Sequence, residues 1–115
     1  MDKELIQQGD VLFFRTNDLP KGLKRKKAVR PGLATFAEGE VTGHHHSAVI
    51  EKIDGRKTDN ITLYEKDGVL YCSVRKETTV THQEHKPVTL PMGDYRVGIV
   101  REYDPFEKEI RDVRD

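Results

Sequence analysis

The chain has 115 residues, of which 35% are hydrophobic and 35% are charged, and its twenty basic and twenty acidic side chains give a formal net charge of zero. This balance argues against a protein that coats DNA through a general basic excess. The length suits one hydrophobic core, so we expect residues 1–115 to form a single domain. Cys72 is the only cysteine, which excludes a disulfide within the chain.

The cellular compartment is predicted from the N-terminus and from the cysteine content. The first ten residues, MDKELIQQGD, lack the apolar region of a signal peptide. No run approaches the ~20 apolar residues that a membrane-spanning helix needs. A lone thiol is typical of a reducing environment. We therefore expect a soluble, cytoplasmic protein.

Runs of β-branched and apolar residues predict strands, beginning with GDVLFFR (9–15) and SAVIEKI (47–53). The segment NITLYEKDGVLYCSV (60–74) alternates with a period of two on both sides of Asp67-Gly68. An Asp-Gly pair favours a type I′ turn, because both central residues of that turn need positive φ. This segment therefore predicts a two-residue hairpin.

The strand pattern continues through TTVTH (78–82) and KPVTLPMGDYRVGIVREY (86–103). Only the last residues, 104–115, predict a helix, with Asp104 as the N-cap and Pro105 at the first helical position. Short strands at regular spacing followed by one helix indicate a mainly-β fold class. We expect a small single-domain β-barrel or sandwich with a short C-terminal helix.

One segment, KGLKRKKAVRPG (21–32), is strongly basic. Its simplest interpretation is a solvated loop, since the rest of the chain is electrically balanced. The alternative is an arm that contacts phosphate groups. In that case an anionic ligand would be held by Lys24, Arg25, Lys26 and Lys27.

Three consecutive histidines, His44 to His46, precede a predicted strand. On an extended strand His44 and His46 project to one side and His45 to the other. Two imidazoles that lie two residues apart on one face are well placed to bind a single metal ion. Glu40 would join the same face if the strand extended back that far.

The other two histidines, His82 and His85, lie three residues apart. A flat strand would point them to opposite faces, whereas a tight turn or one 3₁₀ turn would bring them together. Pro87 supports such a break, because it disfavours helical geometry at the residue before it. Both clusters can thus present two imidazoles each.

Four neutral imidazoles suit a divalent transition metal, with Zn²⁺ as the first choice and Ni²⁺, Cu²⁺, Mn²⁺ and Fe²⁺ as alternatives. Two histidines with Glu40, Glu51 or Glu84 would instead form a facial triad for non-haem iron. Four histidine ligands would make a structural site, and three with an open position a catalytic one. Polar surface loops without a ligand are the competing interpretation. The predicted metal ligands are His44, His46, His82 and His85.

The blocks GEVTGHHH (39–46), THQEHKPVTLPMGDYRV (81–97) and REYDP (101–105) resemble an uncharacterised family of short bacterial and phage proteins. That family carries a QGDV start, a GEVTGHxH block, a THEEHxPIxLPPGxY block and an REYxP end. The match includes QGDV (8–11) and most of residues 39–105. The resemblance implies a shared fold, and residue by residue it points to the same four histidines with Glu84 beside them.

A weaker similarity is to cupins, which hold an H-x-H strand and a later histidine inside a β-barrel. Here Glu51 lies five residues beyond His46, outside the usual cupin spacing, so the similarity is one of architecture. Cys72 lies in the middle of the predicted strand VLYCSV. We expect it to pack as a small apolar residue and not to act as a nucleophile.

Three functions compete, and the sequence leaves open whether the chain is an enzyme or an oligomer. The first is a metal-binding β protein with an accessory or binding role. The second is a metal-dependent hydrolase that acts on a phosphate-containing or nucleic-acid substrate. In that enzyme Zn²⁺ would lower the pKa of bound water to ~7 and Glu84 would be the general base. The third is a phage-encoded host-interaction protein, which is supported by size and family resemblance alone.

Overall fold

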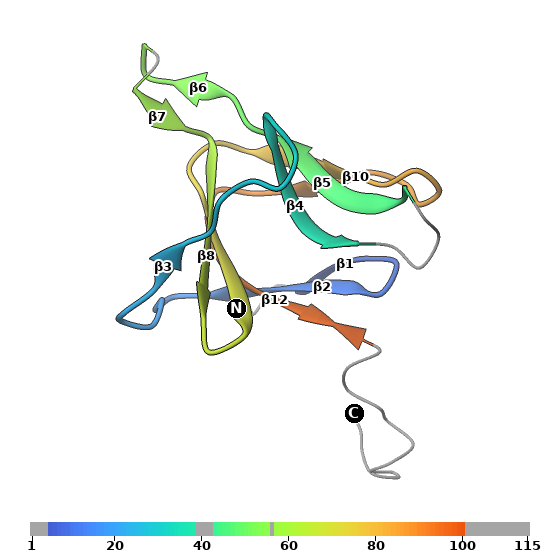
Figure 1. The fold of residues 1–115 in the computed structure, drawn as a ribbon, viewed down its shortest axis with the longest axis horizontal. Helices are drawn as coiled ribbons and strands as arrows, with labels where there is room; N and C mark the ends of the chain where they lie inside the picture. The colour runs from blue at the N-terminus through green and yellow to red at the C-terminus, as the bar shows by residue number, and fades with distance from the viewer. Residues whose placement is uncertain (1–4, 39–42, 56, 101–115) are drawn as a thin grey trace, which may run out of the picture.

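The computed structural model describes residues 5–38, 43–55 and 57–100, and all regular secondary structure in these ranges is β. The strands form a six-stranded sheet, a four-stranded sheet and a two-stranded ribbon, and every strand pair is antiparallel (Figure 1). In chain order the strands are β1 (Leu5–Gln8), β2 (Val11–Thr16), β3 (Lys24–Arg25), β4 (Leu33–Glu38), β5 (His45–Val49), β6 (Lys52–Ile53), β7 (Thr58–Asp59), β8 (Ile61–Lys66), β9 (Val69–Val74), β10 (Thr78–Thr81), β11 (Val88–Leu90) and β12 (Gly93–Ile99).

The six-stranded sheet has the order β1-β2-β12-β9-β8-β3. Its β8–β9 hairpin closes through Asp67 (φ 52°) and Gly68 (φ 80°), so both central turn residues have positive φ. This confirms the hairpin predicted from the Asp-Gly pair. The last strand, β12, lies between β2 and β9 and ties the two ends of the chain into one sheet.

The four-stranded sheet has the order β11-β10-β5-β4. Alternate residues of both sheets meet in one apolar core, where the rings of Phe13 and Phe36 contact edge to face at 5.1 Å between centroids. Phe13 lies on β2 of one sheet and Phe36 on β4 of the other, so this contact joins the two layers. The buried apolar core residues are Val11, Phe13, Ala34, Phe36, Ala48, Ile61, Leu63, Cys72, Val74, Val80, Leu90, Tyr95 and Val97.

The predicted β-barrel with a C-terminal helix is wrong, whereas the mainly-β fold class is confirmed. The sheets are separate and do not close into a barrel, and no helix occurs in residues 5–38, 43–55 or 57–100. Closure needs continuous pairing between edge strands, and two of the four edges are the two-residue β3 and the three-residue β11. The predicted helix at 104–115 lies outside the described residues. Within the described part of the chain, no helix could cross a membrane.

Cys72 is fully buried on β9, as expected for a residue that packs in the core. Burial raises the pKa of its thiol far above the usual value, and the carboxylate of Asp94 adds to the effect. The thiolate is the nucleophilic form of cysteine. Cys72 therefore has neither the exposure nor the charge state that a nucleophile needs.

Candidate metal centre

The two histidine clusters meet at one end of the molecule. Strands β5 and β10 pair with Thr81 opposite Ser47, and this register places the residues before Ser47 beside the residues after Thr81. The predicted proximity of the clusters is confirmed by the ring-centroid distances, which are 4.3 Å for His46–His82, 4.7 Å for His82–His85, 5.5 Å for His44–His82 and 6.0 Å for His46–His85. We call these four residues the histidine cluster.

His45 points away from the histidine cluster, as strand alternation predicts. Its Nδ1 lies 2.7 Å from the hydroxyl oxygen of Ser47, which in turn lies 2.9 Å from the hydroxyl of Thr35 on β4. Its backbone N–H donates to the side-chain oxygen of Gln83 at 2.8 Å. His45 is therefore a nearby histidine with a separate structural role.

His46 is the buried member of the cluster, with 2% of its surface exposed. The amide nitrogen of Gln8 donates to the carbonyl oxygens of Val80 (3.0 Å) and Lys86 (2.9 Å), so the amide oxygen of Gln8 must be an acceptor. That oxygen lies 2.7 Å from Nδ1 of His46, so Nδ1 carries the hydrogen and donates. In the neutral ring Nε2 is then left with the lone pair.

A carboxylate faces that nitrogen. Oδ1 of Asp10, at the turn between β1 and β2, lies 3.7 Å from Nε2 of His46, too far for a hydrogen bond. Two donor atoms on one tetrahedral Zn²⁺, with bonds of ~2.0 Å, lie about 3.3 Å apart. The separation of the two atoms is thus close to that of two ligands on one ion.

His82 is already engaged in its own turn. Its Nδ1 accepts the backbone N–H groups of Glu84 (3.0 Å) and His85 (3.3 Å), which is the tight turn predicted from the spacing of the two histidines. In the neutral ring Nε2 then carries the hydrogen. Burial lowers the pKa of His82, and the neighbouring imidazoles of His85 and His44 lower it further. Both effects favour the neutral form of His82, which is the form that caps this turn.

His85 lies against the β1–β2 turn. A Cβ placed on Gly9 would come within 2.6 Å of Nε2 of His85, so a larger residue at position 9 would displace the ring. Gly9 also has a φ of 58°, which L residues rarely adopt. The turn therefore holds Asp10 and His85 on adjacent sides of one glycine.

The predicted carboxylates are placed differently from one another. Oε2 of Glu84 lies 3.7 Å from Nδ1 of His44, and the Glu84 side chain is 64% exposed. Glu51 follows the far end of β5, about 16 Å along the chain from His46 at strand spacing, which rules it out as a ligand. Glu40 lies outside the described residues.

The ring nitrogens and carboxylate oxygens of these residues do not converge on one point. Within residues 5–38, 43–55 and 57–100, no three side chains of His, Cys, Asp or Glu form a group that could hold a metal ion as placed. The imidazoles instead contact one another ring against ring. The predicted ligand roles of the four histidines therefore stay predictions.

Three contributors to this site are absent from the sequence-based prediction, namely Gln8, Gly9 and Asp10. Gly9 and Asp10 occur there only at the start of the predicted strand GDVLFFR (9–15), and Gln8 only in the QGDV block. The QGDV block of the family resemblance contains all three, and it was the one available indication that this turn belongs with the histidines.

The basic segment at residues 21–32 is partly structured, although we predicted a solvated loop. Lys24 and Arg25 form β3 on the edge of β8, and Arg25 makes an ion pair of 3.2 Å with Asp59. A pocket of about 350 Å³ lies here. Its cationic lining residues are Arg25, Lys26 and Lys27. The anionic ligand predicted for this segment stays a prediction.

Residues 7–100 match the family model described as Domain of unknown function (DUF8820). The matched range includes the whole histidine cluster and the β1–β2 turn. The comparison with curated proteins gave no match, and the comparison with solved structures gave none either. The similarity to cupins is therefore not shown.

Proposed function

The chain belongs to the DUF8820 family, and we propose that it binds one divalent transition-metal ion, with Zn²⁺ as the first choice, at the histidine cluster. The ligands in this proposal are His46 and His85, through their imidazoles, and Asp10. In this proposal the bound ion has a structural role, because it links the β1–β2 turn to β5 and to the loop after β10.

The observation that carries the proposal is the hydrogen bond from Nδ1 of His46 to Gln8. Metal-binding histidines usually donate their second ring nitrogen to a fixed acceptor, which selects the tautomer and orients the ring. Here the acceptor is itself fixed by two backbone carbonyl groups, those of Val80 and Lys86. A buried imidazole held in this way presents Nε2 toward Asp10.

The spacing of the rings also supports the proposal. A tetrahedral Zn²⁺ with Zn–N bonds of ~2.0 Å places the centres of its imidazole ligands about 5 Å apart. The centroid distance between the two proposed histidine ligands, His46 and His85, is 6.0 Å, and their ring planes are 15° apart. Convergence on one ion then needs rotation of side chains and no rearrangement of the strands. His85 can rotate at low cost because its side chain is exposed.

His82 has a different part in this proposal. Binding through its Nε2 would require the tautomer with hydrogen on Nδ1, and the turn would then lose its two N–H acceptors. We therefore assign it as a positioning residue that holds the turn and with it His85. His44, beside Glu84 at the rim, is the histidine available for a fourth ligand.

A hydrolytic role is the second candidate, favoured by one observation. If His44 does not bind the ion, the three proposed ligands leave one coordination position open, which is the arrangement of catalytic zinc sites. Glu84 is exposed at the rim of the cluster, where a general base would be needed. Hydrolysis of a phosphodiester that is lost in both His46→Ala and Glu84→Gln would support this role. Activity retained in either variant would exclude it.

The test of metal binding is elemental analysis of protein that is purified without a polyhistidine tag. We expect one transition-metal ion per chain in the wild type and none in His46→Ala. His45→Ala is the matched control, because His45 is adjacent in sequence but bonded to Ser47, and it should retain the ion. Equal metal content in His46→Ala and His45→Ala, or no metal in the wild type after zinc addition, would contradict the proposal.

A further inference from the structure

The outer face of the six-stranded sheet carries a row of large side chains that the metal proposal does not use. Residues directly opposite each other on neighbouring strands are Leu5 and Phe14, Phe14 and Arg96, Arg96 and Tyr71, and Tyr71 and Tyr64. One residue from each of β1, β2, β12, β9 and β8 therefore lies in a single line across the sheet. We call this line the aromatic row.

The aromatic row faces away from the core. On β2 and β12 the neighbouring residues Phe13, Tyr95 and Val97 are buried between the sheets, so Phe14 and Arg96 point to the opposite side. Leu5, at the end of the row, is 55% exposed. The other four members of the row are half-buried, so the row forms one continuous surface of large side chains, and such a contiguous surface is typical of a binding site.

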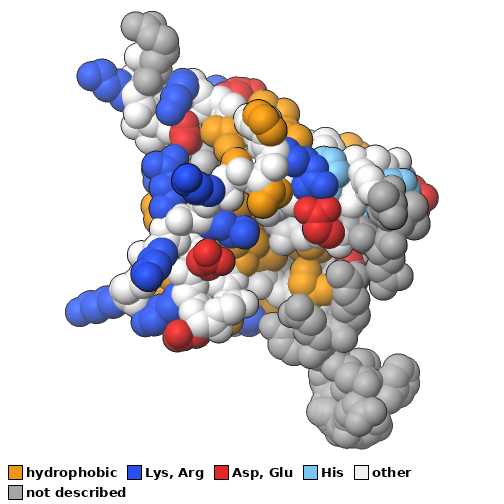
Figure 2. All heavy atoms as spheres, in the orientation of Figure 1, with side chains coloured by type: hydrophobic (Ala, Val, Ile, Leu, Met, Phe, Trp, Pro, Cys, Tyr) orange, Lys and Arg blue, Asp and Glu red, His pale blue; other side chains and the backbone are white. Residues whose placement is uncertain are grey.

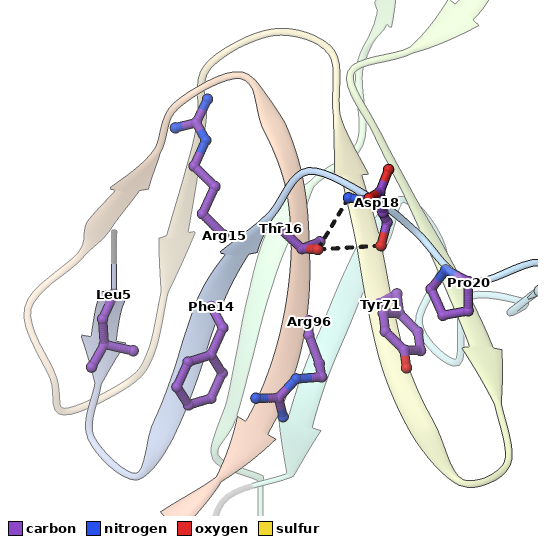
Figure 3. Close-up of a pocket in the computed structure, with 8 residues that line it drawn as sticks. All are labelled: Leu5, Phe14, Arg15, Thr16, Asp18, Pro20, Tyr71 and Arg96. Atoms are coloured by element: carbon purple, nitrogen blue, oxygen red, sulfur yellow. Dashed lines mark hydrogen bonds between the residues drawn. The ribbon is translucent and has the colours of Figure 1, made fainter. Parts of the chain in front are cut away.

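The row also lines a hollow. A pocket of about 460 Å³ is bordered by four members of the row together with Arg15, Thr16, Asp18 and Pro20. In Figure 3 Leu5, Phe14, Arg96 and Tyr71 lie side by side, while Pro20 stands beyond Tyr71 and Arg15 points away from them. The pocket is therefore lined by aromatic rings and a guanidinium group on the sheet and by Pro20 at its side.

The chemistry of the row suits flat rings. The guanidinium carbon of Arg96 lies 4.3 Å from the ring centroid of Phe14, a cation–π contact, and the rings of Tyr71 and Tyr64 follow on the next two strands. Aromatic rings and arginine planes are the two kinds of surface on which unpaired bases stack. Across five strands spaced by ~4.8 Å, the row spans about 19 Å.

Positive charge lies at one end of the row and negative charge near its middle. Lys66 is two residues after Tyr64 on the same face, and Arg25, which also pairs with Asp59, lies opposite Tyr64 on β3. Figure 2 shows Lys and Arg side chains gathered on the side where β3 lies. Asp18, in contrast, lines the pocket itself. A phosphate backbone would therefore follow the β8–β3 end while bases occupy the hollow.

We propose that the aromatic row binds single-stranded nucleic acid. Stacking of bases on the row supplies most of the contact, and the cations at the β3 edge contact the backbone. Stacking does not need the overall basic excess that duplex-coating proteins carry, so the neutral net charge of the chain is compatible with this ligand. A duplex hides its base faces, so it cannot use the row.

The test is fluorescence anisotropy with labelled oligothymidine and oligouridine of about 12 nucleotides, next to a duplex of the same length. We expect both single strands to bind, more weakly as salt rises, and to bind tighter than the duplex. Addition of EDTA to the wild-type protein should leave this binding unchanged, which separates the inference from the metal site. No salt-sensitive binding of either strand, or equal binding of the duplex, would overturn the proposal.

The variants give the proposal a residue-level test. Tyr71→Ala should weaken binding by about fivefold to a hundredfold, whereas Tyr71→Phe, which keeps the ring, should stay within about twofold. Asp18→Asn should tighten binding, since it removes the carboxylate from the hollow. Val49→Ala is the control, because Val49 is an exposed apolar residue on the other sheet, about as exposed as Leu5. It should leave the affinity for the oligonucleotides unchanged. Wild-type affinity in Tyr71→Ala, or self-association through this face without nucleic-acid binding, would overturn the assignment.

Discussion

The β1–β2 hairpin contributes to both the histidine cluster and the aromatic row, and these two regions differ in how deeply their side chains are buried. At its turn, Gln8, Gly9 and Asp10 join the histidine cluster, where Gln8 and His46 are almost fully buried and hydrogen-bonded to each other. At its other end Leu5 and Phe14 begin the aromatic row, which stays half-exposed. A polar group buried without a partner is costly, whereas an exposed ring costs little. Mutations at the turn should therefore lower both the stability of the fold and its affinity for metal. Mutations on the aromatic row should lower nucleic-acid binding with little effect on stability.

The largest expected effect on stability is that of Gln8→Ala. The change leaves Nδ1–H of His46 and the carbonyl oxygens of Val80 and Lys86 without their partner in the core. Unpaired buried groups cost ~1–3 kcal/mol each, with partial relief from entering water, so we expect a loss of about 2–4 kcal/mol. Urea unfolding measures it.

Gln7→Ala is the control for that prediction. Its amide nitrogen donates to the carbonyl oxygen of Gly9 at an exposed position, so its removal should change the free energy of unfolding by no more than about 0.5 kcal/mol. Similar losses for Gln7→Ala and Gln8→Ala would remove the distinction between a buried network and an exposed turn.

Gly9→Ala and Gly68→Ala test whether the turn holds the proposed site. Both glycines have positive φ, so each alanine should destabilise the fold by ~1–2 kcal/mol. Only the alanine at Gly9 meets His85, because nothing lies within 4 Å of the Cβ position at Gly68. Zinc affinity should therefore fall by about tenfold or more in Gly9→Ala alone, as measured by competition with a chelator. Equal zinc affinity in the two variants would contradict the assignment of His85 as a metal ligand.

The pH dependence of the metal-free protein should report the turn that His82 caps. Its pKa in the folded state is lowered from the ordinary 6.5, mainly by burial, so below that pH the unfolded chain takes up the proton more readily. Stability should fall as the pH drops from about 7 toward the folded-state pKa. His82→Asn keeps an acceptor for the turn without a titrating ring, so its unfolding midpoint should vary less over this range. If the unfolding midpoint of His82→Asn changed with pH as much as that of the wild type, groups other than His82 would control the pH dependence.

Among the residues of the two proposed sites, the smallest expected effect on stability is that of Tyr71→Ala. The side chain is half-buried on the outer face and contributes through contacts with Tyr64 and Arg96 on neighbouring strands. Cross-strand pairs of this kind are worth ~0.2–1 kcal/mol, so the loss should be about 1 kcal/mol or less. Thermal unfolding by circular dichroism measures it. A loss as large as that of Gln8→Ala would show that the aromatic row is part of the structural core.

Part of this molecule follows directly from local sequence rules. The β8–β9 hairpin was predicted because an Asp-Gly pair between alternating strands has one favoured geometry. The opposite orientations of His45 and His46 follow from the two-residue period of a strand. The turn that joins His82 and His85 follows from Pro87 and a three-residue spacing. In each case the residues that decide the structure are neighbours in the chain.

Other parts depend on long-range pairing and were missed. In β4 three successive residues, Ala34 to Phe36, are buried, and a bulge between Thr35 and Ala37 breaks the alternation that identifies a strand. β1 is a four-residue edge strand ending in two glutamines. The place of Asp10 beside His46 depends on how the β1–β2 hairpin packs against β5, and no local pattern encodes that.

The most direct measurement is nitrogen NMR of the histidine rings during zinc titration of the metal-free protein. We predict that one equivalent of Zn²⁺ shifts Nε2 of His46 and a ring nitrogen of His85, while Nδ1 of His46 keeps its hydrogen and the ring of His45 is unchanged. Shifts confined to His45, or no shift at any ring, would contradict a metal centre built on the imidazole that Gln8 orients.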